Sequence, residues 1–175
     1  MRWIRLLFAL LRAGYKKKLS IVENSQMDFR VWITDVDASI MNHAAMMTVL
    51  ECGRIDFMVR TGFFLLARRE NWYVPSSGIH VQFMRPLKIF QKATVVTKLI
   101  SGNERSICLE QKVLKSEKLV AACIVECTVR KGRETVDVNE IIRRLGADRL
   151  EPQAEDLIDS FHKTAGMIRG HATGS

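Results

Sequence analysis

One long helical segment followed by a series of strand-like segments most constrains the fold of this chain. Residues 41–61 have the 3.6-residue periodicity of a helix of about five turns, and Gly62 ends it. Gly53 lies on the same stripe as the apolar residues of this helix. Because a glycine inside a helix costs about 1 kcal/mol relative to alanine, we expect it to mark a close approach of the helix to a sheet. A second, shorter helix is predicted over residues 63–70.

Five segments have the alternating or β-branched character of strands. The first precedes the long helix, and its predicted buried face carries Met27, Phe29, Val31 and Ile33. The other four follow the helix and span residues 73–84, 93–100, 106–114 and 119–130. A long helix must bury its apolar stripe, and an antiparallel sheet with short connections offers a face for it. We therefore predict an α+β fold in which a curved antiparallel sheet of about five strands wraps one long central helix.

The chain divides into three predicted parts. Residues 1–20 form a basic amphipathic helix, residues 26–145 form the main domain, and residues 146–175 form a C-terminal helix and tail. Helices are predicted over 136–145 and 152–167, with a loose tail over 170–175.

The first 18 residues combine a basic stripe with a large apolar surface. The basic stripe contains Arg2, Arg5, Arg12 and Lys16, with Ala9 between them. The apolar surface contains Trp3, Ile4, Leu6, Leu7, Phe8, Leu10 and Leu11. The run is shorter than the roughly 20 residues that span a bilayer, and no signal-peptide cleavage site follows it. Two interpretations stay open: the helix lies on an anionic membrane, or its apolar face packs on the protein's own body or on a second subunit.

The net charge and the cysteine spacing limit the classes of partner and cofactor that we expect. The net charge of +8 favours an anionic partner, such as a phospholipid surface or a phosphate-bearing molecule. Nucleic acid is not expected, because the basic residues are dispersed and aromatic residues make up only 7% of the chain. Cys52, Cys108, Cys123 and Cys127 lack zinc-site spacing, so they are predicted to be buried free thiols in a reducing cytosol, with no metal or cofactor.

The chemistry-bearing residues cluster where the long helix begins. Asp35, Asp37, Asn42 and His43 lie within ten residues of one another. A helix N-terminus carries unpaired N–H groups that stabilise developing negative charge, and a nearby carboxylate can attack a carbonyl or activate water. Aspartate and asparagine also cap helices, and we assign such a turn or capping role to Asp35. On the residues alone, His43 is equally a structural or a catalytic candidate.

Four segments of the chain resemble the 4-hydroxybenzoyl-CoA thioesterase family. They are residues 30–37, 41–43, 50–54 and 78–87, the last of which ends in Arg-Pro-Leu. The resemblance implies a hotdog fold and hydrolysis of a thioester of CoA or acyl carrier protein, with Asp37 as nucleophile or general base. It implies an oxyanion contact from the backbone N–H of Asn42 or His43, proton transfer by His43, and an acidic helix position at Glu51. It also implies a homodimer or homotetramer. The cysteines favour the cytoplasm, and the basic amphipathic pattern of residues 1–18 is compatible with peripheral contact at the inner membrane face.

The chain departs from the family motif beside the expected site. It is one residue shorter between Asp37 and Met41, Ile40 stands in place of the motif's histidine, and Met46 stands in place of its tyrosine. These departures leave an alternative open, in which the same fold serves as a non-catalytic acyl-binding or membrane-associated scaffold. A dehydratase of this fold would need a histidine–glutamate pair, which the sequence does not indicate.

Overall fold

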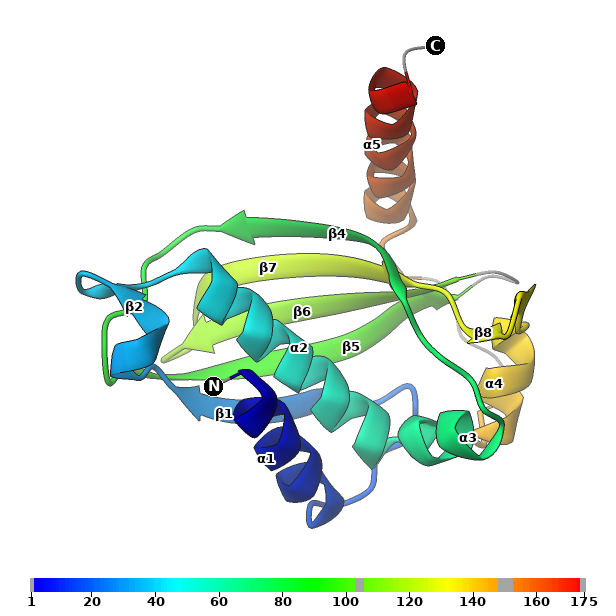
Figure 1. Ribbon diagram of the computed structural model, residues 1–175, viewed down its shortest axis with the longest axis horizontal. Coiled ribbons are helices and arrows are strands. Elements are labelled where there is room, and N and C mark those ends of the chain that lie inside the picture. The colour runs from blue at the N-terminus through cyan, green and yellow to red at the C-terminus, as the bar shows by residue number, and fades with distance from the viewer. Residues whose placement is uncertain (1, 103–105, 148–152, 174–175) are drawn as a thin grey trace.

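The computed structural model describes residues 2–102, 106–147 and 153–173, and a five-stranded antiparallel sheet forms its centre. The strand order is β1-β5-β6-β7-β4 (Figure 1). The strands are β1 Ser25–Arg30, β4 Ser76–Phe83, β5 Lys92–Gly102, β6 Ile107–Lys115 and β7 Lys118–Cys127. Two short hairpins lie outside this sheet: β2 Val36–Asp37 with β3 Ile40–Met41, and β8 Arg130–Lys131 with β9 Glu134–Thr135.

Helix α2, His43–Arg60, crosses one face of the sheet and supplies much of the core. Its residues Leu50 and Phe57 are fully buried. A Cβ atom built on Gly53 would lie 2.7 Å from Val95 Cγ1 of β5, closer than carbon atoms pack. The predicted close approach of helix and sheet at Gly53 is therefore confirmed, and so is the hotdog fold itself.

The first strand is shorter than its alternation predicts. The chain leaves the sheet after Arg30, Val31 is buried, and a 3-10 helix, η1 Ile33–Asp35, follows. The carboxylate of Asp35 accepts the backbone N–H of Trp32 at 2.8 Å, and this local bond competes with continued strand pairing. Ile33 is exposed as a result, so its predicted place on the buried face is wrong.

Two short helices close one end of the sheet. Gly62, at φ +80°, makes the turn from α2 into α3, Phe63–Arg69. Helix α4, Val138–Arg144, buries Val138, Ile141 and Ile142 in the same core.

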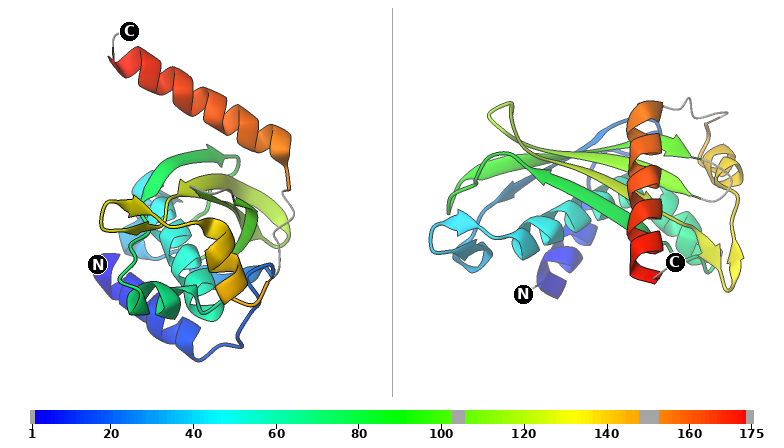
Figure 2. Two further views of the ribbon diagram at one scale, coloured as in Figure 1. Left: turned by 90° about the vertical axis from the view of Figure 1, so that its right-hand side faces the viewer. Right: turned by 90° about the horizontal axis from the view of Figure 1, so that it is seen from above.

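Helix α5, Glu155–Thr173, projects from the opposite face of the sheet (Figure 2). Its first turns are anchored on the sheet: Ile158 packs with Ile100, Cys108 and Ile124, and Phe161 contacts Gly78. The predicted loose tail from Gly170 is wrong as far as Thr173, because the helix continues to that residue. A glycine near a helix end costs only about 1 kcal/mol, which is too little to stop it.

Helix α1, Arg2–Gly14, packs along α2 with its small residues and Arg5 on the inner side. Ala9 and Ala13 are buried and Leu6 packs against the core, whereas Trp3, Ile4, Leu7, Phe8 and Leu11 are exposed. Most of the predicted apolar face therefore does not pack on the protein's own body, and its contact with a membrane or a second subunit stays a prediction. Alanines allow two helices to approach closely, and bulky outward residues do not interfere. Within the described residues, no helix is long and apolar enough to cross a membrane.

Candidate active site

The segment before α2 is a compact turn held by Asp35. The carboxylate of Asp35 is buried and accepts from Arg5 Nη2 at 2.5 Å as well as from the N–H of Trp32. Its backbone oxygen accepts the N–H of Asn42 at 2.8 Å. The structural role assigned to Asp35 agrees with these contacts, since it joins α1, the turn and the start of α2.

Asp37 and Asn42 meet across the β2–β3 hairpin. Ala38, at φ 60°, makes the tight turn of this hairpin and leaves the Asp37 side chain exposed. Asn42 is the N-cap of α2: its Oδ1 accepts the N–H of Ala45 at 2.8 Å, and its Nδ2 donates to Asp37 Oδ1 at 3.2 Å. The N-terminus of α2 therefore carries an oriented carboxylate directly beside it.

A cleft of about 270 Å³, named here the α2 cleft, opens at the N-terminus of α2. Its lining combines apolar side chains with two polar ones at the helix start and one arginine: Ile40, Met41, Asn42, His43, Met46, Phe83, Met84, Arg85, Pro86 and Leu87. The ring of His43 packs against Phe83 of β4, with centroids 4.6 Å apart and a tilt of 41°. Asn42 and His43 thus lie together at the cleft, and Asp37 reaches it through its bond to Asn42.

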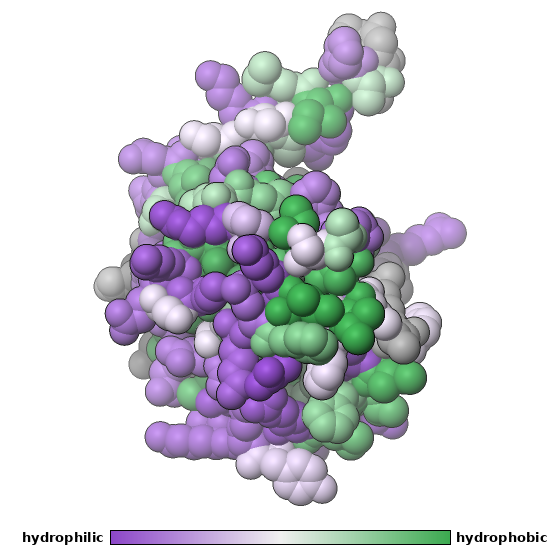
Figure 3. Space-filling model, turned by 90° about the vertical axis from the view of Figure 1, so that its left-hand side faces the viewer, coloured by the Kyte–Doolittle hydropathy of each residue, from purple (hydrophilic) through white to green (hydrophobic). Residues whose placement is uncertain are grey.

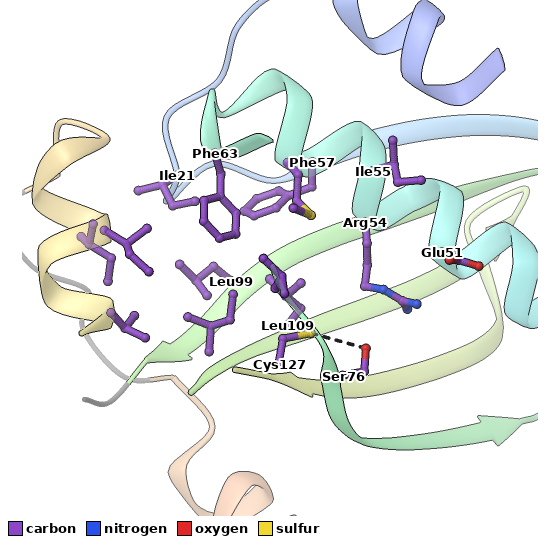
Figure 4. A pocket seen from close by; sticks show the side chains of 16 residues that line it. Ile21, Glu51, Arg54, Ile55, Phe57, Phe63, Ser76, Leu99, Leu109 and Cys127 are labelled. Carbon is purple, nitrogen blue, oxygen red and sulfur yellow. Dashed lines mark hydrogen bonds between the residues drawn. The ribbon is translucent and has the colours of Figure 1, made fainter. Parts of the chain in front are cut away.

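Glu51 lies apart from these residues, at an inner cavity of about 180 Å³ between the second half of α2 and the sheet. Eight residues of helix separate it from His43, a rise of about 12 Å. Figure 4 shows Arg54 pointing from α2 into this cavity above Ser76 and Cys127, with Glu51 at the same end. Most of the remaining lining is apolar, including Leu99, Leu109 and Phe63. The structure therefore separates Glu51 from the other predicted site residues.

A buried polar network beneath α2 was not anticipated from the sequence. Gln111, on β6, is fully buried and donates to the Leu50 carbonyl at 2.8 Å and to Thr97 Oγ1 at 3.1 Å. Its Oε1 accepts from Arg54 Nη1 at 2.9 Å. A glutamine on the face of β6 that otherwise carries Leu109 and Val113 is the one signal that could have indicated it. The network holds the guanidinium of Arg54 at the polar end of the inner cavity.

All four cysteines are free and buried, as predicted. Burial raises the pKa of Cys123 to about 11 and that of Cys108 to about 12. Burial also raises the pKa of Cys127, and the hydrogen bond between its Sγ and Ser76 Oγ, 3.6 Å long, partly opposes this. Neutral, enclosed thiols are poor nucleophiles, so the cysteines are not candidates for catalysis.

One group of side chains in the described part of the chain has the composition and spacing to hold a metal ion. Cys108, Glu126 and His162 have their ligand atoms within 4.8 Å of one another, on the sheet face opposite α2. His162 Nε2 lies 2.9 Å from Glu126 Oε1, and Ser77 and Ser106 also donate to this carboxylate. These bonds already satisfy the hydrogen-bonding capacity of the Glu126 carboxylate, and the bond to His162 attaches α5 to the sheet. They also supply a histidine–glutamate pair that the sequence did not indicate, at a place remote from the α2 cleft.

Several solved structures have a similar fold. A probable thioesterase from Bartonella henselae is 24% identical with a TM-score of 0.60, covering 66% of this chain and 98% of that one. The probable thioesterase YbaW from Escherichia coli is 19% identical with a TM-score of 0.63, covering 72% and 98%. A DHNA-CoA thioesterase from Staphylococcus aureus is 13% identical with a TM-score of 0.61, covering 87% and 95%. No curated protein sequence matches the chain.

The five-stranded sheet around α2 defines a hotdog protein. The model of the thioesterase-like superfamily matches residues 31–145, so the chain belongs to that superfamily and is a thioester hydrolase. The match includes Asp37, the whole of α2 and the sheet from β4 to β7.

Proposed function

We propose that this protein hydrolyses an acyl thioester at the N-terminus of α2, with Asp37 as the nucleophile or general base. The observation that carries the proposal is the hydrogen bond between Asp37 and Asn42, the N-cap of α2, at the edge of the α2 cleft. Asp37 Oδ1 accepts this bond, and Oδ2 makes no hydrogen bond within the described residues. Oδ2 therefore attacks the thioester carbonyl, or takes a proton from a water that attacks it.

We assign the oxyanion contact to the backbone N–H of His43. The N–H of Asn42 already donates to the Asp35 carbonyl at 2.8 Å. The N–H of His43 opens the first turn of α2 and has no hydrogen-bond acceptor among the described residues. The dipole of an 18-residue helix adds to its effect on a developing oxyanion. When the tetrahedral intermediate collapses, the carbon–sulfur bond breaks and the thiolate leaves. On the general-base route the thiolate takes up the proton that Asp37 removed from water; on the nucleophilic route water then hydrolyses the acyl-aspartate anhydride, which frees the acid and supplies the proton.

The acyl group is proposed to follow the apolar seam between α2 and the sheet. The inner cavity lies in this seam, about 12 Å along α2 from the reacting carbonyl, which suits a medium or long chain. Arg85 lines the α2 cleft and offers a cation to the phosphates of CoA or of the acyl carrier protein's prosthetic group. Glu51 is proposed to line the acyl path rather than to join the chemistry.

A cytoplasmic homodimer is the proposed state of the enzyme. β4 is an edge strand of the sheet, and its side chains Ile79 and Phe83 are exposed. Pairing of β4 with the same strand of a second copy would satisfy its outer backbone groups and cover these apolar side chains. Phe83 also lines the α2 cleft, so the dimer contact would enclose the site.

The test is hydrolysis of a series of acyl-CoAs of graded chain length by the wild type and by Asp37→Asn. We expect activity on medium or long chains, and a loss of at least about hundredfold in kcat/KM in the variant, as for the loss of a general base. The matched control is Asp159→Asn, which removes an exposed carboxylate from α5. Full activity in a folded Asp37→Asn protein would place the chemistry elsewhere, and tight acyl-CoA binding without any turnover by the wild type would favour the scaffold.

A further inference from the structure

Helix α1 presents an apolar face that nothing in the described chain covers. Five large side chains of this helix are between 55% and 78% exposed: Trp3, Ile4, Leu7, Phe8 and Leu11. Tyr15, just beyond the helix, is 93% exposed. Figure 3 shows hydrophobic side chains gathered along one side of the molecule, next to a hydrophilic surface. Contiguous apolar surface of this kind marks a binding face rather than ordinary surface.

The outward orientation of this face is held by specific contacts on the inner side of α1. Arg5 pairs with the buried Asp35 at 2.5 Å, and Lys16 pairs with the buried Asp56 at 2.7 Å. Turning the helix to bury its apolar side chains would break both pairs, leaving Asp35 buried without a cation and Asp56 with Arg60 alone. The structure therefore keeps the apolar face exposed.

The apolar surface extends from α1 across a groove to β1. Ile4 and Phe8 line one wall of this groove of about 290 Å³, and Trp32 lines the other. Trp32 in turn packs edge-on against Phe90, with ring centroids 6.4 Å apart. Arg12 and Arg30, both exposed, line the same groove. Aromatic side chains and arginines around an aliphatic face are the composition found at the lipid headgroup region.

We propose that α1 docks the protein on the surface of an anionic lipid bilayer, with its apolar face in the boundary between headgroups and acyl chains. At 13 residues the helix is about 20 Å long, too short to cross a hydrocarbon core of about 30 Å, so it lies in the membrane plane. The inference is independent of the proposed hydrolysis, because none of the residues that carry it belongs to the α2 cleft.

Charge selects lipid over a second copy of the chain as the occupant. Residues 1–18 contain six basic residues and no acidic one. Asp35 and Asp56 neutralise two of the six, so the segment keeps an excess of positive charge. Two such faces, in a protein of net charge +8, would repel one another, whereas an anionic bilayer attracts each of them.

The test is sedimentation of the full chain with vesicles of phosphatidylcholine, alone or mixed with phosphatidylglycerol. The wild type should bind the mixed vesicles, bind pure phosphatidylcholine more weakly, and be released in part by salt. The variant Leu7→Gln/Leu11→Gln should lower the partition coefficient by about tenfold or more, since it removes aliphatic groups from the docking face. Acyl chains carrying bromine should quench the tryptophan fluorescence of the wild type, and Trp3→Phe should remove much of this quenching.

The matched control is Leu65→Gln/Ile168→Gln, which makes the same kind of change at two exposed apolar side chains of α3 and α5. It should bind vesicles as the wild type does, and thermal unfolding should show that both double variants fold. Three results would overturn the proposal. They are absence of vesicle binding by the wild type, equal loss in the two double variants, and a self-association without lipid that depends on Leu7 and Leu11.

Discussion

Lys16 and Asp56 form an ion pair that joins the segment after α1 to the middle of α2. The ammonium lies 2.7 Å from Asp56 Oδ1, while Arg60 approaches Oδ2 at 3.3 Å, and the carboxylate is almost fully buried. Towards the other end of α1, the pair between Arg5 and Asp35 joins the helix to the turn that precedes α2. Basic side chains thus attach α1 and the segment after it to the body, while most of the large apolar side chains of α1 stay exposed.

The Arg5–Asp35 pair should contribute measurably to stability. Arg5→Met leaves the Asp35 carboxylate buried with one N–H donor, so we expect the free energy of unfolding to fall by about 3 kcal/mol. Urea denaturation measures it. Arg12→Met is the matched control, because Arg12 is exposed and contacts only a backbone carbonyl, and should cost less than about 1 kcal/mol. Equal effects of the two substitutions would contradict a special role for the buried pair.

Gly53 and Gly166 should respond in opposite directions to the same substitution. Gly53→Ala places a Cβ atom 2.7 Å from Val95 Cγ1, so we expect a loss of about 1–3 kcal/mol from overpacking. Gly166→Ala, in the exposed part of α5, meets nothing within 4 Å and should stabilise that helix by about 0.5–1 kcal/mol. Thermal unfolding of the first variant and amide hydrogen exchange in α5 of the second provide the measurements. A neutral Gly53→Ala would show that the helix can move off the sheet without cost.

Two substitutions at His43 test the contributions of its imidazole and of its backbone N–H to kcat separately. His43→Gln keeps the N–H and should change kcat by less than about tenfold, because the ring packs on Phe83 rather than on Asp37. His43→Pro removes the N–H and should lower kcat by about 10²–10³. Proline is tolerated at the first position of a helix, and Asn42, at φ −79° and ψ 163°, already has the conformation required before proline. A large loss in His43→Gln would instead assign proton transfer to the imidazole.

The stability of the protein should fall at alkaline pH through its buried thiols. Burial raises the pKa of Cys123 from 9.0 to about 11, so between these values the unfolded chain has released a proton that the folded protein retains. The stabilisation is complete below pH 9 and is lost as pH rises towards 11, by up to about 1.4 kcal/mol per pH unit. Cys123→Ala should make the unfolding free energy less steep in this window. An unchanged slope would show that other groups, such as lysines, control alkaline unfolding.

The sequence by itself determines the fold and the place of the candidate site. The 3.6-residue period of α2, the strand patterns after it and the turn residues between them are local properties that act before tertiary contacts form. The concentration of Asp37, Asn42 and His43 at the start of α2 is likewise a matter of chain order, so the helix-start site follows from the sequence. Gly53 even indicates a tertiary contact. A glycine inside a helix lowers its stability, so we expect a compensating gain, such as close packing of the helix on the sheet.

Only the tertiary structure decides which partners these residues meet. Glu51 shares α2 with His43, yet the packing of α2 on β5 and β6 turns it to a different cavity. Gln111 acquires its role through Leu50 and Arg54, contacts that span more than fifty residues of sequence. The direction of α1 was undetermined for the same physical reason. An amphipathic pattern shows that two faces of a helix differ, but not which of them packs on the protein. The buried carboxylates of Asp35 and Asp56, which come from distant segments of the chain, determine that the face bearing Arg5 turns inward.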